Sequence, residues 1–320
     1  MQGGAGVDQS IGKTTVNLTY LFTRGVHQYL TDSVNAQDFD PSTYTLSGPL
    51  PSVYNYQFQS EGVYSEQQIL LTANVMIHHL ALHGNYTFTH ANSDTQSVNY
   101  FPSDSRDPGL DYGRATFSIR NRVFLLGTHN LPHGVILAPL LVAQSGTPFN
   151  VNLGTDLTGN NQFNARPTFG TCGAANVVST QYGCLDTDPT GKGEPIVPYN
   201  LGTGPANFVM HLRASKAIGI GPRIKGATGP GSMQGGGGGV GGRGLSGSQA
   251  QVKLDASVRR RYNLTLIAAA MNMFNIVNKG APNGTLSSTL FGQSQSLANG
   301  PFGSPIPGNR VIFVQALFSF

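Results

Sequence analysis

Three histidines lie close together in the sequence and have side chains that could bind a metal ion. His78 and His79 are adjacent, and His83 follows four residues later. Zinc sites combine such histidines with cysteine or carboxylate ligands at fixed spacings, and none accompanies these three. They also straddle an expected turn at His78 to Leu80. We therefore expect no metal site here.

Three aspartates, Asp104, Asp107 and Asp111, carry oxygen ligands that suit calcium. Their segment lacks the glycine and the terminal glutamate of an EF-hand loop, so an acidic, solvated loop is expected instead. The sequence contains no GxSxG, HExxH or Walker motif, and its eight histidines are dispersed. These absences predict that the chain is not an enzyme and needs no cofactor.

The two cysteines, Cys172 and Cys184, have eleven residues between them in a stretch rich in Gly, Asn and Thr. A disulfide that closes this loop would suit an oxidising compartment. Two free thiols are the alternative, because sequence alone does not fix the geometry that a disulfide requires.

The composition is unusual for a cytosolic protein. Charged residues are 11% of the 320 residues, against about 25% in an average soluble domain, and 42 residues are glycine. The net charge of +4 comes from basic residues that are scattered except at Arg259 to Arg261, so no nucleic-acid partner is expected. There is no apolar run of eighteen residues and no signal-peptide pattern at Met1 to Gly12, so any membrane assignment must rest on strands.

Apolar residues recur at every second position in long segments, which is typical of strands with two different faces. Ile69, Leu71 and Ala73, for example, alternate with Gln68, Thr72 and Asn74. The pattern predicts about eight strands: Val16–Phe22, Gln68–Ile77, Leu82–Thr89, Gly113–Gly127, Val135–Val142, Phe208–Ala217, Val252–Phe274 and Ile312–Phe320.

The segment Gly113 to Gly127 has the most strongly contrasting faces. Phe117, Val123 and Leu125 would share one face, while Arg114, Arg120 and Arg122 would share the other. In a membrane barrel these three arginines would be basic residues that face the lumen.

A soluble antiparallel sandwich shows similar alternation, but its strands average about five or six residues. Strands of ten or more residues are long enough to cross a bilayer. Long polar loops at 93–112, 148–205 and 275–309 alternate with tight turns near residues 78–80 and 130–134. Outer-membrane barrels have this asymmetry, which would place the long loops outside and the tight turns in the periplasm.

The Gly-rich segment Gly221 to Ala250 is expected to be a flexible insertion on the periplasmic side. The assignment of connections to the outside or the periplasm depends on the number of strands. It would weaken if Val252 to Val258 and Tyr262 to Phe274 formed two strands rather than one.

Several motifs occur in the order found in the second half of TonB-dependent outer-membrane receptors. They are Asp107–Arg114, Arg120–Arg122, Leu131–Gly134, Ala143–Phe149, Arg261–Leu266, Asn272–Asn275, Phe291–Gln293 and Leu317–Phe320. The chain resembles this family, and more narrowly its Oar-like branch, whose members carry a carboxypeptidase-regulatory-like domain.

The resemblance implies that residues 1–320 form a single C-terminal segment of a barrel of about 22 strands with a plugged lumen. The signal peptide, the energy-coupling box and the plug have no counterpart in this sequence. The implied function is TonB-dependent uptake of a siderophore, glycan or peptide, with capture by the outer loops, above all Pro148 to Pro205. The implied partners are outer-membrane lipid, the TonB complex acting through the missing plug, and the barrel-assembly machinery, which would recognise Phe318 and Phe320.

Two alternatives remain at this point. The chain could form a small outer-membrane barrel by itself, with a structural role or a narrow channel. It could instead be a surface β-sandwich that binds glycans.

Overall fold

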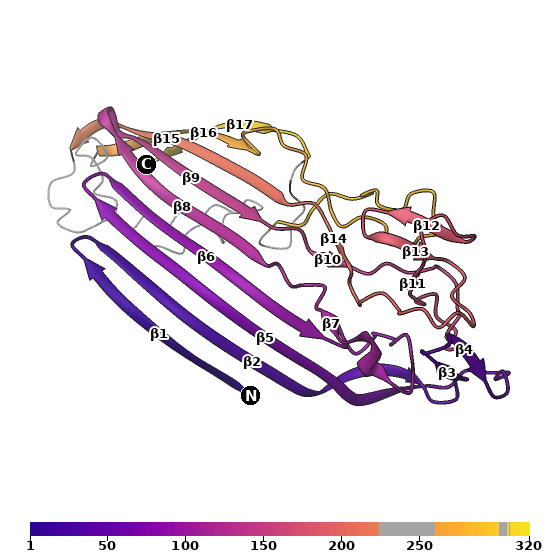
Figure 1. Ribbon diagram of the computed structural model, residues 1–320. Helices are drawn as coiled ribbons and strands as arrows, with labels where there is room; N and C mark the ends of the chain where they lie inside the picture. Colours follow the sequence, from indigo (N-terminus) through magenta and orange to yellow (C-terminus); the bar gives the residue numbers. More distant parts are fainter. Residues whose placement is uncertain (224–259, 301–305, 307) are drawn as a thin grey trace.

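The computed structural model describes residues 1–223, 260–300, 306 and 308–320, and these residues are almost entirely β-strands and loops (Figure 1). In this part of the chain, nine long antiparallel strands form one sheet in which each strand pairs with the long strand before it. They are β1 (Gln2–Ile11), β2 (Thr14–Ser33), β5 (Tyr56–Ile77), β6 (Leu80–Ser93), β8 (Asn121–Leu131), β9 (Val135–Gln144), β15 (Asn207–Arg223), β16 (Arg260–Met271) and β17 (Val311–Ser319).

The predicted all-β antiparallel fold is confirmed, with several corrections to its strands. The first strand, β1, was missed because glycines and polar residues break the alternation of its sequence. The prediction of one strand over Gly113 to Gly127 is wrong. Arg114 belongs to β7 (Gly113–Arg114), which pairs with the end of β6, and Ala115 to Arg120 interrupt the ladder before β8 begins.

The Gly-rich segment overlaps the end of β15, which runs to Arg223, and residues 224–250 lie outside the described residues. Val252 to Val258 also lie outside them. Within the part that is described, β16 is a single strand from Arg260 to Met271.

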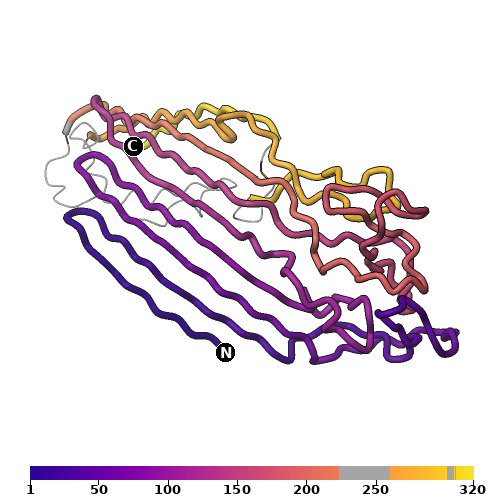
Figure 2. Tube along the Cα trace, viewed as in Figure 1, coloured from indigo at the N-terminus to yellow at the C-terminus, as the bar shows by residue number. Residues whose placement is uncertain are grey.

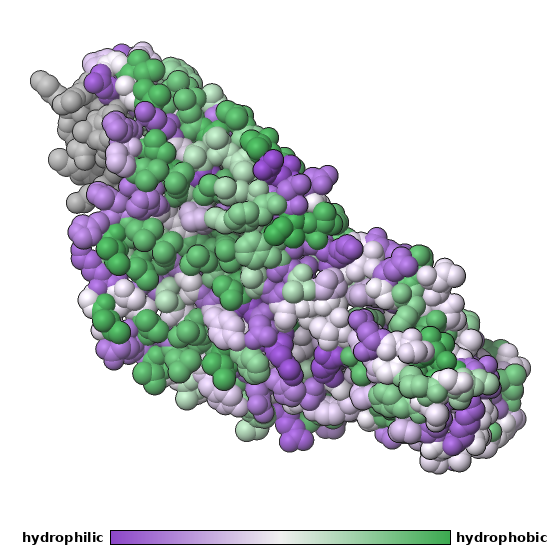
Figure 3. Space-filling model, turned by 45° about the horizontal axis from the view of Figure 1, so that its top comes forward, coloured by the Kyte–Doolittle hydropathy of each residue, from purple (hydrophilic) through white to green (hydrophobic). Residues whose placement is uncertain are grey.

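Strand register places the apolar residues of successive strands on one face of the sheet. One cross-strand row joins seven strands in the order Val7, Leu18, Leu71, Tyr86, Val123, Ala143 and Phe208. Val7 is 68% exposed and Leu18 is 50% exposed. Figure 3 shows hydrophobic residues gathered over the strands, while the loop end is more mixed. We call this side the apolar face, and it is suited to contact lipid.

The next row lies on the opposite, polar face and changes character along the sheet. Asp8, Asn17, Thr72 and Asn85 are followed by Phe124, Val142 and Val209. Val142 and Val209 are buried because Ala298 and Ile306, from the connection between β16 and β17, pack against them. The last long connection therefore lies partly against the polar face.

Among the described residues, short and long connections lie at opposite ends of the sheet (Figures 1 and 2). The tight turns are at Gly12–Lys13, at His78–His79 and at η2 (Pro132–Gly134), and His78 and His133 have positive φ angles of 46° and 64°. Apart from 224–259, which lie outside the described residues, the long connections are 34–55, 94–120, 145–206 and 272–310, the last of which is described except at 301–305 and 307. Their short elements are β3 (Asp38–Asp40), β4 (Thr45–Ser47), η1 (Pro108–Asp111), β10 (Pro148–Phe149), β11 (Thr168–Phe169), β12 (Val177–Thr180), β13 (Gly183–Asp186) and β14 (Gly202–Thr203).

The sheet is an open wall in the described residues, since β1 and β17 do not pair with each other. An unpaired backbone group in hydrocarbon costs several kcal/mol, so both edges require partner strands in a membrane. No second large sheet covers the apolar face in this part of the molecule, which is inconsistent with a sandwich. Across the same residues, no helix has the length and hydrophobicity needed to span a bilayer.

Candidate functional site: the loop assembly

The long connections fold together at one end of the sheet, and we call residues 34–55, 94–120, 145–206 and 272–300 the loop assembly. Its main apolar cluster comes from the third connection, with one residue from the fourth. The buried members are Phe149, Val151, Leu153, Ala165, Leu185, Val197 and Leu286. Because the third and fourth connections share this core, they form a compact unit rather than separate loops.

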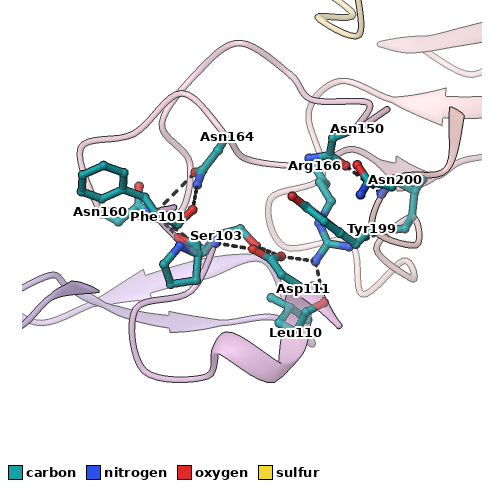
Figure 4. A network of polar contacts seen from close by, with 12 residues as sticks. Phe101, Ser103, Leu110, Asp111, Asn150, Asn160, Asn164, Arg166, Tyr199 and Asn200 are labelled. Atoms are coloured by element: carbon teal, nitrogen blue, oxygen red, sulfur yellow. Dashed lines mark hydrogen bonds and ion pairs between the residues drawn. The ribbon is translucent and has the colours of Figure 1, made fainter. Parts of the chain in front are cut away.

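The second connection is joined to the third by a buried ion pair (Figure 4). The Asp111 carboxylate at the end of η1 lies 2.9 Å from the Arg166 guanidinium, and their side chains are 2% and 3% exposed. Arg166 also donates to the carbonyl oxygens of Leu110 and Val197, each at 2.8 Å. A buried ion pair persists only when further hydrogen bonds compensate both groups for lost hydration.

The carboxylate of Asp111 also accepts hydrogen bonds from residues of its own connection. The hydroxyl of Tyr100 donates to Oδ2 at 2.6 Å, and the backbone amide of Ser103 donates to the same oxygen at 2.7 Å. The Ser103 hydroxyl donates to Oδ1. Asp111 is therefore a structural centre that organises the segment 100–111.

Three tyrosines pack around this centre and remain protonated at neutral pH. Burial raises the pKa of Tyr44 and Tyr100 above the ordinary value, and it raises the pKa of Tyr199 to about 12. Tyr44 donates to the Arg166 carbonyl oxygen at 2.5 Å, and the Arg166 guanidinium lies 5.8 Å from the centre of the Tyr199 ring. These contacts bring the first connection into the same unit.

Asparagine side chains provide the other links between the second and third connections. Asn160 donates to the carbonyl oxygen of Pro102 at 2.8 Å, and Asn164 donates to that of Phe101 at 2.9 Å (Figure 4). Asn200 donates to the backbone carbonyl of Arg114. Side-chain amides suit this task because each can satisfy irregular backbone that has no strand partner.

The cysteines lie in and beside a small three-stranded sheet on the third connection, with Cys172 in the turn that follows β11. Cys172 and Cys184 form a disulfide with their Cα atoms 5.3 Å apart, and Cys184 lies in β13 between β11 and β12. Lys192 contacts Asp186 at the end of β13 at 2.5 Å. Burial raises the pKa of Asp186, but hydrogen bonds from Lys192 and a backbone amide outweigh it and lower the pKa overall.

The three arginines expected to face the lumen do not share one face. Arg122 pairs with Thr87 and Gln144 on the polar face. Arg114 pairs with Asn92, which lies on the apolar face of β6. Arg114 and Arg122 are on different faces because the ladder is interrupted between β7 and β8. Arg120 lies in the interruption and is exposed. The predicted lumenal row therefore does not form.

The histidines and aspartates considered as metal ligands are used differently. His78 and His79 form the turn between β5 and β6, whereas His83 contacts Asn74 on the polar face at 2.7 Å. Asp104 accepts a hydrogen bond from the Arg106 amide. The carboxylate of Asp111 is occupied by hydrogen bonds from Tyr100 and Ser103 and by the ion pair with Arg166. Across the described residues, no group of three potential ligands is arranged to bind a metal ion.

The terminal aromatic residues lie on the apolar face. Phe318 pairs with Leu264 in the ladder and stacks on Tyr262 with ring centres 6.0 Å apart. Phe320 is 95% exposed and 6.4 Å from the Phe318 ring. Both rings are therefore accessible to lipid or to a partner strand.

Sequence reasoning missed Arg166, Tyr100 and the linking asparagines. Nothing in the local sequence distinguishes Arg166, because its partner is 55 residues away on another loop. Asp111 and Arg114, by contrast, lie within one of the motifs quoted above, the segment Asp107–Arg114. In the structure these two residues of the motif join the second connection to the third.

Comparison with known protein families supports the membrane assignment. A family model described as an outer membrane beta barrel domain matches residues 1–312. The chain is similar to the outer membrane transporter YddB from Escherichia coli, with 11% identity, a TM-score of 0.44, and coverage of 98% of this chain and 32% of that chain. It is also similar to BauA, the ferric preacinetobactin receptor from Acinetobacter baumannii, with 12% identity, a TM-score of 0.43, and coverage of 99% and 29%. The chain spans about a third of the length of these structures. No curated protein matches it.

Proposed function

The chain belongs to the outer membrane β-barrel domain family and lies in the cell outer membrane, and from this premise we propose that it is part of a TonB-dependent receptor. The receptor would take up a scarce ligand such as a siderophore, a glycan or a peptide. In this proposal the nine strands are one section of a wall of about 22 strands. The energy-transducing plug, which contacts the TonB complex, would come from outside this chain.

The loop assembly is the observation that supports capture of a ligand. Its four connections lie at one end of the sheet, and the buried pair Asp111 and Arg166 joins the second of them to the third. A surface that is folded before binding loses less conformational entropy when a ligand arrives, which favours affinity. We assign this end to the outside of the cell and capture chiefly to residues 148–205.

The open edges of the sheet support the larger barrel. The edges β1 and β17 are unpaired in the described residues, and membrane barrels leave no strand unpaired in lipid. Additional strands of the same receptor would satisfy both edges. Phe318 and Phe320 would then form the end that the barrel-assembly machinery recognises.

The first test measures the size of the native polypeptide in purified outer membranes, with an antibody against residues 148–205 and peptide mass spectrometry. We expect a band roughly three times heavier than the 33.8 kDa of this chain, with additional peptides, as the coverage of the similar structures indicates. A heat-modifiable band near 33.8 kDa would contradict the proposal and favour the self-standing small barrel.

A second test addresses transport. Cells would be offered isotope-labelled ferric siderophores, oligosaccharides and oligopeptides, with and without a protonophore. Loss of the receptor should abolish protonophore-sensitive uptake of one class. Removal of the tip between Cys172 and Cys184, which leaves the Asp111 centre intact, should weaken binding of that class. Uptake of every class at wild-type rates in cells that lack the receptor would overturn the assignment.

A further inference from the structure

A cavity of about 140 Å³ lies at the loop end of β8, where the ladder between β6, β8 and β9 stops. Its lining includes His90, Arg114, Arg120, Asn121, Ser145 and Thr203, and none of its lining residues is acidic. The cavity is therefore cationic.

The register shows which side of the wall this cavity faces. Phe88 pairs with Ile69, which is 43% exposed on the apolar face, and Asn121 is the partner of Phe88 on β8. His90 lies two residues after Phe88 on the same strand, and Arg114 pairs with Asn92, two residues further. Because alternate residues of a strand share a face, these cavity residues lie on the lipid side of the sheet.

A second, apolar groove of about 350 Å³ continues from the cavity toward the membrane-facing row. Val123, Ala143 and Phe208 line it, and they are consecutive members of that row. The small side chain of Ala143 between two larger ones leaves room for an aliphatic chain. Asn121 and Ser145 line both the groove and the cavity, so the two are continuous.

Arg114 is positioned in the cavity without being neutralised. Its guanidinium donates to the carbonyl oxygens of Leu201 and Gly202 at 2.7 and 2.9 Å, and to the Thr203 hydroxyl at 2.9 Å. All of these acceptors are uncharged. Arg120 and His90 are exposed beside it. A planar, pre-positioned guanidinium next to a second one is well matched to the oxygens of a phosphate group.

We propose that the cavity and the groove together bind one phosphorylated glycolipid of the outer leaflet. Arg114 and Arg120 contact its phosphate, and one acyl chain lies along Ala143 between Val123 and Phe208. The site combines a cationic pocket with an apolar groove on the lipid side, at the junction between the strands and the loop assembly. It rests on the outward orientation of the loop assembly assigned under the proposed function, and it is independent of the ligand that the receptor takes up.

The test uses the intact protein extracted from outer membranes and native mass spectrometry with added monophosphoryl lipid A. We expect Arg120→Ala to weaken binding by about tenfold, the scale of one charge-assisted hydrogen bond. Dephosphorylated lipid A should bind the wild-type protein more weakly by a similar factor. Ala143→Leu, which fills the groove, should also lower binding.

Two matched controls separate this site from general lipid association. Arg122→Ala removes the same charge from the opposite face of the same wall, and Ala214→Leu adds the same volume on the apolar face near the turn end. Both should retain wild-type binding, and heat-modifiable migration checks that every variant is folded. Equal binding of the phosphorylated and dephosphorylated lipids, or equal losses in Arg120→Ala and Arg122→Ala, would overturn the proposal. Displacement by millimolar inorganic phosphate without lipid preference would identify a free-phosphate site instead and would also overturn it.

Discussion

Asp111 and Arg166 lie 55 residues apart in the sequence, yet their charged groups meet at 2.9 Å with almost no exposure to solvent. One residue comes from the second long connection and the other from the third. Their contact makes two loops into one structural unit.

Asp111→Asn should loosen the loop assembly while leaving the strands paired. The substitution leaves the Arg166 charge buried without a counter-ion, which costs about 3–5 kcal/mol. Hydrogen exchange followed by mass spectrometry should show faster exchange in residues 100–111 and 160–200. Asp38→Asn is the control, because the Asp38–Arg106 pair is exposed and such pairs contribute about 0–1 kcal/mol. Equal effects of the two variants would argue against a central role for Asp111.

The contact between Asp186 and Lys192 predicts that the hairpin of β12 and β13 becomes less stable in acid. The pKa of Asp186 is lowered in the folded protein, so its contribution is fully present above the ordinary carboxylate pKa of about 4. The contribution is lost as the pH falls through the lowered value. Exchange protection of Val177 to Asp186 should therefore decrease below about pH 4. Asp186→Asn should remove this pH dependence, and an unchanged profile would contradict the assignment.

Loss of the disulfide should affect the third connection locally. In the chain-entropy model, closing a loop with a separation of 12 residues contributes roughly 3 kcal/mol. The double variant Cys172→Ser, Cys184→Ser should be cleaved faster by proteases between residues 168 and 186. Heat-modifiable migration of the barrel should not change, because the long strands lie elsewhere. Faster cleavage throughout the chain would show a wider role for the disulfide.

The two faces of β5 should respond differently to the same substitution. Leu71→Arg places a charge on the apolar face and should cost about 2–4 kcal/mol if the site is near the bilayer midplane. Thr72→Arg places the charge on the polar face and should be nearly neutral. Urea unfolding in lipid vesicles measures both free energies of unfolding. Equal costs would mean that the apolar face does not contact lipid.

The long strands could be predicted from the sequence because one face is apolar and the other polar, so that apolar and polar residues alternate along the chain. In residues 68–77 and 82–89 apolar residues recur at nearly every second position, and both segments lie within observed strands. The prediction failed at Gly113 to Gly127, where the alternation continues but the ladder does not. There Ser118 donates its backbone amide to Ala115, and its hydroxyl accepts from the Ala91 amide, so a turn interrupts the pairing.

The loop assembly was less predictable than the wall, because its contacts join residues far apart in sequence. Tyr44, Asp111 and Arg166 come from three different connections, and no spacing rule relates them. The length and polarity of the connections led to the prediction that they capture the ligand. Their shared core and the buried ion pair follow only from the three-dimensional arrangement.

Strands β2 and β5 are longer than a crossing of the bilayer requires. β5 has 22 residues and therefore extends roughly 70 Å, which at a tilt of about 45° is a height of about 50 Å. The hydrocarbon core is only about 30 Å thick. In the proposed orientation, the strands therefore continue beyond the hydrocarbon core and hold the loop assembly outside the bilayer. A ligand arriving from the medium would meet the loop assembly before it reached the bilayer.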